Sequence, residues 1–130
     1  MENLATGGCG ACFQPIYNNF TYSFVAQSGQ QVVLLWKLYA TPTNNGAPSE
    51  SDYFYSKIEV LDATGNLVYS GPINQKSFLG SFSIFSAIAL GPDLLATGAQ
   101  YQASLYYLIP NVNLQMQVTG AAITAIKARE

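Results

Sequence analysis

Hydrophobic residues run almost without interruption through Gln31–Ala40, QVVLLWKLYA, which also holds the chain's one tryptophan. On a β-strand, alternate side chains point to opposite faces. One face carries Val32, Leu34, Trp36, Leu38 and Ala40. The other face is also mostly apolar, so the pattern predicts a strand covered on both sides, by the core and by a further layer or another subunit. A short buried helix is the alternative, but the β-branched and aromatic residues and the preceding Ser28-Gly29 turn favour a strand.

Other stretches alternate between apolar and polar positions and predict more strands separated by turns. The predicted strands are Asn19–Ala26, Gln31–Ala40, Tyr53–Leu61, Leu67–Ser70, Ser77–Leu90, Gln100–Ile109, Val112–Thr119 and Ala121–Lys127. We expect the first two to form a hairpin through Gln27–Gln30, and Asp62–Asn66 to form a hairpin turn with Gly65 at positive φ. A helix is the alternative for Ser83–Leu90 and for Ala121–Lys127.

About eight strands, with turn signals every ten or so residues, predict an all-β fold: a single antiparallel β-sandwich, jelly-roll-like. We divide the chain into an irregular N-terminal arm containing Gly and Cys, residues 1–18, and a sandwich domain, residues 19–130. At 130 residues, the chain is long enough to bury one core. The predicted core is Phe20, Tyr22, Phe24, Leu34, Trp36, Leu38, Ile58, Val60, Phe82, Ile84, Leu105, Tyr107, Leu114, Met116, Val118 and Ile126.

The composition is poor in charge and rich in aromatic residues. Charged residues make up 9% of the chain, against about 25% in a typical soluble domain. There are nine Tyr, seven Phe and no His. Such a surface does little to keep molecules apart, and the centres of protein interfaces share its composition. We therefore expect the chain to bury much of its surface against copies of itself or against a larger shell protein.

Nucleic-acid binding, a membrane span and a signal peptide are all disfavoured. A net charge of −2 with five basic residues provides no basic patch for nucleic-acid phosphates. No apolar run reaches the ~18–20 residues of a membrane span. The N-terminus lacks the basic start and apolar segment of a signal peptide. We expect synthesis in the cytoplasm and a final location in a virion or extracellular particle; a secreted protein whose signal has been removed is the alternative.

Catalysis is also disfavoured, and no cofactor is expected. Without histidine there can be no Ser-His-Asp triad and no Cys-His pair. A glycosidase needs two carboxyl groups ~5–9.5 Å apart across a cleft. Glu50 and Asp52 share one loop, and Glu59 shares a strand face with Lys57, so we interpret these charges as surface groups.

Cys9-Gly10-Ala11-Cys12 is the one motif with intrinsic chemistry. Cys9 and Cys12 have the spacing of half a zinc site, and a second subunit would have to supply the other half. A redox CxxC normally opens a helix, which this glycine-rich stretch does not predict. Plain or disulfide-linked cysteines, an intermolecular contact, a metal site and a redox site remain alternatives.

Tyr53 and Tyr55 stand two residues apart on one strand face, beside the predicted loop 41–52. Aromatic rings with amide donors such as Asn44 and Asn45 are suited to binding sugars. These four residues are our candidate carbohydrate site. The alternative is that the tyrosines pack between subunits, because tyrosine is enriched at both kinds of surface.

The run from Phe20 to Val32, FTYSFVAQSGQQV, resembles the opening hairpin of bacterial pre-peptidase C-terminal domains, which are secreted β-sandwich modules. The chain as a whole resembles small virion structural proteins of the capsid, decoration or tail-associated type. That resemblance rests on a short Met-initiated chain with few charges, aromatic-rich strands and a glycine-rich N-terminal arm. It implies a non-enzymatic structural or assembly role; a carbohydrate- or cell-surface-binding module is the alternative.

Overall fold

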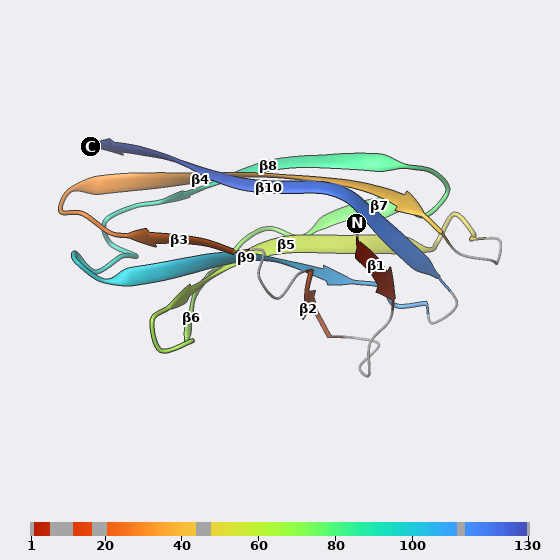
Figure 1. Cartoon of the computed structure of the whole chain (residues 1–130), viewed down its shortest axis with the longest axis horizontal. Coiled ribbons are helices and arrows are strands. Elements are labelled where there is room, and N and C mark those ends of the chain that lie inside the picture. The colour runs from red at the N-terminus through yellow and green to blue at the C-terminus, as the bar shows by residue number, and fades with distance from the viewer. Residues whose placement is uncertain (1, 6–11, 17–20, 44–47, 112–113, 130) are drawn as a thin grey trace.

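The computed structural model describes residues 2–5, 12–16, 21–43, 48–111 and 114–129. These residues form two antiparallel β-sheets packed face to face (Figure 1). The strands are β1 (Glu2–Ala5), β2 (Gln14–Pro15), β3 (Thr21–Val25), β4 (Gln30–Pro42), β5 (Tyr53–Asp62), β6 (Leu67–Ser70), β7 (Asn74–Ser77), β8 (Phe82–Leu90), β9 (Gln100–Leu108) and β10 (Gln115–Arg129). Among the described residues, no helix is long and apolar enough to cross a membrane.

The order of the strands identifies the sandwich as a jelly roll. Sheet A has the order β1-β10-β4-β8, and the path of sheet B is β2-β9-β5-β6. Because β2 and β3 both pair with β9, they form one interrupted edge strand, and β6 and β7 form another beside β5. If β2 and β3 are counted as one strand, and β6 and β7 as another, the chain has eight strands in sequence. Sheet A then has the strand order 1-8-3-6 and sheet B the order 2-7-4-5, which is jelly-roll order. The predicted fold class is confirmed.

The core lies between the two sheets and is built from alternate residues of each strand. On β4 the even-numbered side chains from Val32 to Ala40 are buried, including Leu34 and Leu38 with no exposed surface, as the sequence predicted. On β5 the fully buried Phe54 and Ile58 face them from sheet B. Ser56 is buried between those two, and its hydroxyl donates a hydrogen bond to the carbonyl oxygen of Tyr106 at 2.9 Å. Each large apolar side chain buried in this way stabilises the fold by roughly 1.5–3 kcal/mol.

Most of the predicted core is confirmed. The predicted residues that are buried are Phe24, Leu34, Trp36, Leu38, Ile58, Val60, Ile84, Leu105, Tyr107, Leu114, Met116 and Val118. Tyr22 and Phe82 are partly buried against this cluster, and Phe20 lies outside the described residues. Ile126 was predicted wrongly, because its residue is 55% exposed.

A β-bulge in β10 explains that error. Val118 pairs with Ala40 and Gly120 pairs with Tyr39, so Thr119 is an extra residue in β10. A bulge of this kind reverses which residues face the core. Beyond the bulge, odd-numbered residues pack on the core, and even-numbered residues point outward.

The same bulge corrects the predicted boundary at Gly120. The sequence predicted two strands, Val112–Thr119 and Ala121–Lys127, on either side of this glycine. Instead, β10 runs continuously from Gln115 to Arg129. Both halves pair with the single long strand β4, so no turn separates them. The helical alternative for the second half is wrong.

The predicted hairpin between Asn19–Ala26 and Gln31–Ala40 is wrong, although a turn lies between them. Gly29 has a φ of 66°, and the amide of Gln30 donates to the carbonyl oxygen of Gln27 at 3.3 Å. However, β3 pairs with β9 in sheet B, whereas β4 pairs with β10 and β8 in sheet A. The turn therefore carries the chain from one sheet to the other.

Further predictions concern β5 to β8. The hairpin at Asp62–Asn66 is confirmed, with Gly65 at a φ of 87°. The single strand predicted for Ser77–Leu90 is wrong in its first part. Ser77 ends β7, which the sequence missed, and β8 begins at Phe82 after a turn that buries Phe78. β8 is a strand, so the helical alternative there is wrong.

Parts of residues 1–18 belong to the sheets. β1 pairs with β10, and β2 pairs with β9. Ile16 has no exposed surface, and its amide donates to the carbonyl oxygen of Leu105 at 2.9 Å. The predicted reach of this arm to a neighbouring molecule stays a prediction.

Candidate interaction surface on sheet A

The face of sheet A that points away from the core is largely apolar. Strand pairing brings together alternate residues from its three long strands. They are Val33, Leu35, Lys37 and Tyr39 of β4, Ser83, Phe85, Ala87 and Ala89 of β8, and Gly120, Ala122, Thr124 and Ile126 of β10. We call these twelve residues the outer apolar face; Lys37 is their single Lys, Arg, Asp or Glu. The sequence predicted a second cover for β4, and in the described chain these positions are exposed or half-buried.

Large hydrophobic groups stand out from this face. Phe85 is 65% exposed, Ile126 is 55% exposed and Tyr39 is 38% exposed. The rings of Phe85 and Tyr39 meet edge to face, with centroids 5.7 Å apart and planes at 84°. The Lys37 ammonium lies 5.9 Å from the centroid of the Tyr39 ring, a cation–π distance. The one cation is therefore held against an aromatic ring.

A shallow hollow of about 510 Å³ lies in the middle of the outer apolar face. Leu35, Phe85 and Ala122 border it from three adjacent strands. The small side chains of Ala87 and Ala122 line the hollow beside the exposed Phe85 ring. A protruding ring beside a shallow apolar depression suits packing against another protein surface.

The edge strand β8 forms one border of this face. β8 is the last strand of sheet A, and its nine residues pair with β4 without a register shift. Its sequence, FSIFSAIAL, contains no charged residue and no proline. Natural proteins usually protect exposed edges with charges, prolines, bulges or short strands. β8 has none of these features, and no described strand pairs with its other side.

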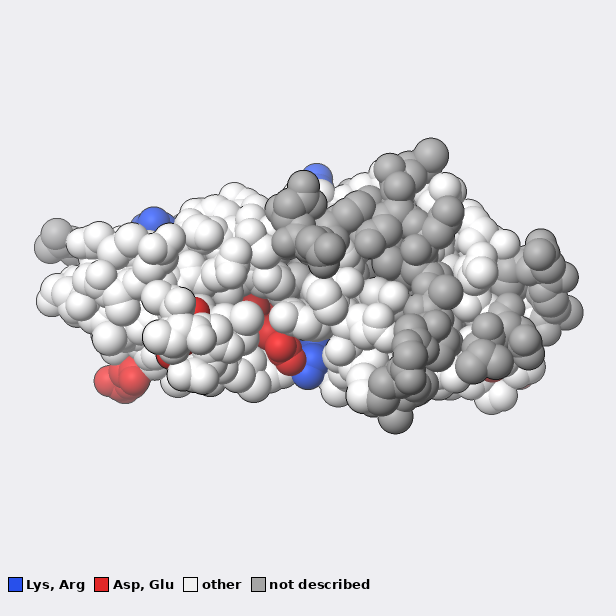
Figure 2. Space-filling model, turned by 60° about the horizontal axis from the view of Figure 1, so that its bottom comes forward, with Lys and Arg blue, Asp and Glu red and all other residues white. Residues whose placement is uncertain are grey.

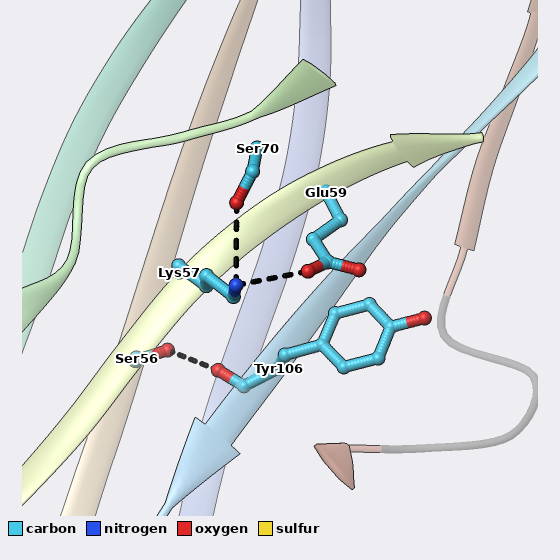
Figure 3. Close-up of polar contacts among 5 residues, drawn as sticks. All are labelled: Ser56, Lys57, Glu59, Ser70 and Tyr106. Atoms are coloured by element: carbon cyan, nitrogen blue, oxygen red, sulfur yellow. Dashed lines mark hydrogen bonds and ion pairs between the residues drawn. The ribbon is translucent and has the colours of Figure 1, made fainter. Parts of the chain in front are cut away.

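The outer face of sheet B is different in chemistry. Seen from this side, charged groups are few and stand among uncharged atoms (Figure 2). Figure 3 shows a polar cluster on β5, β6 and β9. Lys57 Nζ lies 2.9 Å from Glu59 Oε2 and donates a hydrogen bond to Ser70 Oγ at 3.2 Å. Phe13 covers the pair, with its ring centroid 4.4 Å from Lys57 Nζ.

This cluster is satisfied internally, which makes it a poor catalytic centre. Burial, and secondly the negative charge of Glu59, raise the pKa of Tyr106 above its ordinary value. A tyrosine with a raised pKa is a weaker proton donor than usual. The Glu59 carboxylate is engaged in the ion pair with Lys57. The geometry fits a structural ion pair under the Phe13 ring.

The candidate carbohydrate residues are placed in part. Tyr53 and Tyr55 are half-buried on the outer face of sheet B, with ring centroids 6.3 Å apart and planes at 56°. Their rings are therefore not coplanar. Asn44 and Asn45 lie outside the described residues. The sugar site stays a prediction.

The end of the loop before β5 is ordered by Asp52. Its Oδ2 accepts hydrogen bonds from the amide and hydroxyl of Ser49 at 2.8 and 3.1 Å. Its Oδ1 accepts from Asn111 Nδ2 at 3.1 Å. The Ser49 amide, followed by Asn111, lowers the pKa of Asp52 below its ordinary value. Asp52 therefore acts as an anchor between two loops at one end of the sandwich.

The cysteine motif is seen only at its second residue. Cys12 is disulfide-bonded, and Cys9 lies outside the described residues. A disulfide sulfur is not the thiolate that zinc requires. Among the residues that the structure describes, no group of three or more Cys, Asp or Glu side chains is arranged to hold a metal ion. The metal site between subunits stays a prediction.

The exposed residues that the structure brings together in sheet A were not predicted from the sequence. Phe85 was placed in a predicted strand without a role, and Ile126 was assigned to the core. One signal was available: Phe82–Leu90 is apolar or small on both faces and carries no charge. That pattern does not tell a central strand from an edge strand, so the sheet order was needed.

No protein-family model matches the chain, and no curated protein matches it. Among solved structures, the fold is similar to a chain in the structure of infectious bursal disease virus, Gx strain, with a TM-score of 0.51. The two share 8% sequence identity, and the match covers 91% of this chain and 31% of the virus chain. At this identity the likeness concerns the fold alone. This chain spans about a third of the length of the virus chain.

Proposed function

We propose that this chain is a non-enzymatic structural subunit of a virion or a similar protein shell, and that it self-associates through sheet A. The observation that carries the proposal is the outer apolar face, where one of twelve residues is charged and Phe85 and Ile126 protrude. Contiguous apolar surface of this kind on a soluble domain is typical of a protein contact.

Two other observations support the proposal. The jelly roll is an architecture of viral capsid domains, although lectins and cupins use it as well. The likeness to a chain of a virus structure agrees with the first of these uses. The net charge of −2 provides little electrostatic repulsion between copies.

The size of the face indicates how strong one contact can be. Three strands ~4.8 Å apart and seven residues long cover roughly 350 Å² of flat area. A stable, specific contact buries about 800 Å² per partner. The outer apolar face alone falls short, so further contacts must add to it. Many weak contacts acting together are sufficient in a closed assembly.

The proposal is tested by light scattering in different salts. Association through apolar, nearly uncharged surface should persist in concentrated sodium chloride and grow in ammonium sulfate, which is excluded from protein surfaces. Assemblies that sodium chloride dissolves would instead indicate contacts between charges. A chain that scatters as a monomer in both salts would count against self-association as its function.

A carbohydrate- or cell-surface-binding module is the second candidate. The outward position of Tyr53 and Tyr55 favours it, as does the use of jelly rolls by lectins. A glycan array probed with the unsubstituted chain and with a Tyr53→Ala, Tyr55→Ala variant tests this candidate. Binding that the double substitution abolishes would support it. No binding to any glycan by the unsubstituted chain would remove it.

A further inference from the structure

β8 differs from the other edge strands of the described sandwich. The other edge strands are short: β1, β6 and β7 have four residues each, β3 has five and β2 has two. Beyond Val118, where its pairing with β1 ends, β10 also lies at an edge of sheet A, but that stretch contains Lys127 and Arg129. Short edge strands offer little backbone for pairing. β8 has nine residues and an unbroken register with its neighbour. An uncharged edge of this length, with an unbroken register, is a template for another strand.

We propose that β8 pairs antiparallel with β8 of a second copy of this chain, across a two-fold axis through Ser86. The two copies of sheet A then become one continuous sheet, and their outer apolar faces form one larger surface. This inference rests on the proposed function and specifies the contact through which it begins. A two-fold axis places the same strand on both sides, so the contact closes without exposing a new edge.

The centre at Ser86 follows from the strand's length. With the axis at that residue, all nine residues of β8 pair, from Phe82 opposite Leu90 of the second copy onward. Moving the axis by one residue leaves two residues unpaired on each strand. Because an antiparallel pair forms about one backbone hydrogen bond per residue pair, the centred register is the most favourable.

The side chains agree with this register. Phe85 would lie opposite Ala87 of the second copy, on the outer apolar face. Large rings would therefore meet small residues, and neither ring would clash with the other. Pairing would also cover part of Phe85, the most exposed large hydrophobic residue among those described. With no charge in β8, no like charges are brought together.

The strand pair alone would be a weak contact. Nine residues extend about 30 Å, and a strip of that length is well below the area of a standard interface. We therefore expect a reversible dimer whose population rises with protein concentration. In a shell, the other contacts of each subunit would hold the two paired β8 strands together.

Cross-linking of two exposed alanines tests the register. In the proposed dimer, Ala87 and its counterpart are diagonal neighbours, with Cβ atoms about 7–8 Å apart. Ala89 and its counterpart are six residues apart along the strands, about 20 Å. Ala87→Cys should therefore give a covalent dimer with a short bismaleimide, in at least several-fold higher yield than Ala89→Cys. The unsubstituted chain gives the background from the native cysteines.

A matched pair of lysine variants tests the contact without a reagent. Ala87→Lys places two like charges beside the axis and should raise the dimer's dissociation constant on the order of tenfold. Ala63→Lys, in the exposed β5–β6 turn, changes the net charge equally and should leave association unchanged. Circular dichroism confirms that both variants fold.

The outcomes separate this inference from the proposed function. Equal cross-linking at positions 87 and 89, or unchanged association of Ala87→Lys in a chain that still self-associates, would overturn the β8 pairing and leave the proposed function standing. A chain that is monomeric at every concentration would overturn both. Selective cross-linking at position 87, with loss of association in Ala87→Lys alone, would establish the pairing.

Discussion

Leu34 and Leu35 are neighbours in β4 but point to opposite faces of sheet A. Leu34 has no exposed surface and packs in the core, whereas Leu35 is half-buried and lines the hollow of the outer apolar face. One apolar strand thus supplies both the core of the sandwich and the surface that we propose for assembly. This double use explains why neither face of the strand is polar.

Alanine at these two positions should have different effects. Leu34→Ala removes buried methyl groups and leaves a cavity, so we expect the free energy of unfolding to fall by about 2–5 kcal/mol. Leu35→Ala should cost less than about 1 kcal/mol, because its side chain already contacts water. Urea unfolding at low protein concentration measures both. Equal losses would mean that the two faces are not distinct.

Gly71 provides a second test of packing. A Cβ there would lie 2.9 Å from Ile58 Cγ2 and 3.2 Å from the Ile58 carbonyl oxygen. Gly71→Ala should therefore destabilise the fold by about 1–3 kcal/mol through overpacking. Gly80 is the control, because a Cβ there meets nothing within 4 Å and its φ is not positive. A Gly80→Ala variant as unstable as Gly71→Ala would contradict the close packing of Gly71 against Ile58 of β5.

The β5–β6 turn should make the stability of the fold depend on pH in the acidic range. The Thr64 hydroxyl, followed by the Asn66 amide, donates to Asp62 and lowers the pKa of this carboxyl group below 3.8. A lowered pKa stabilises the folded state at pH values above the ordinary pKa of the carboxyl group. That stabilisation is lost as the pH falls through the lowered pKa. Asp62→Ala should therefore lower the melting temperature near neutral pH, and the difference should shrink in strong acid. A difference that does not depend on pH would contradict the role of the ionised carboxylate.

Tyr106 should affect the stability of the fold at alkaline pH. Because its pKa is raised above 10.0, chiefly by burial, its stabilising contribution is present below that pH and is lost as the pH rises through the raised value. Tyr106→Phe should unfold less readily than the unsubstituted chain above pH 10, with little difference near neutrality. Denaturant unfolding at several alkaline pH values measures this. If the two chains had identical stability at every alkaline pH, the pKa of the Tyr106 phenol would not be raised in the folded state.

Local patterns were sufficient to predict β4, the two faces of β5 and the turn at Asp62, because alternation and turn residues act over a few neighbours. The bulge at Thr119 could not be predicted in this way. One extra residue reverses the faces of the rest of β10, and its signal, a glycine after a threonine, also fits a turn. Ile126 moved from the core to the surface for this reason alone.

The candidate site depended on long-range pairing. The turn at Gly29 is compatible with a hairpin or with a crossing between sheets, and only the pairing of β3 with β9 decides between them. Likewise, Phe85 could belong to a covered or an uncovered strand. Its exposure follows from the position of β8 at the end of sheet A. The sequence predicted a second cover for sheet A but not which residues would meet it.

Sedimentation velocity over a concentration series is the most direct test of self-association through sheet A. We expect the unsubstituted chain to shift from monomer to larger species as concentration rises. Phe85→Asp should need on the order of tenfold more protein for the same shift. Leu67→Asp, at a residue 56% exposed on β6 of sheet B, should behave like the unsubstituted chain. A monomer at every concentration, or equal effects of the two substitutions, would contradict assembly through this face.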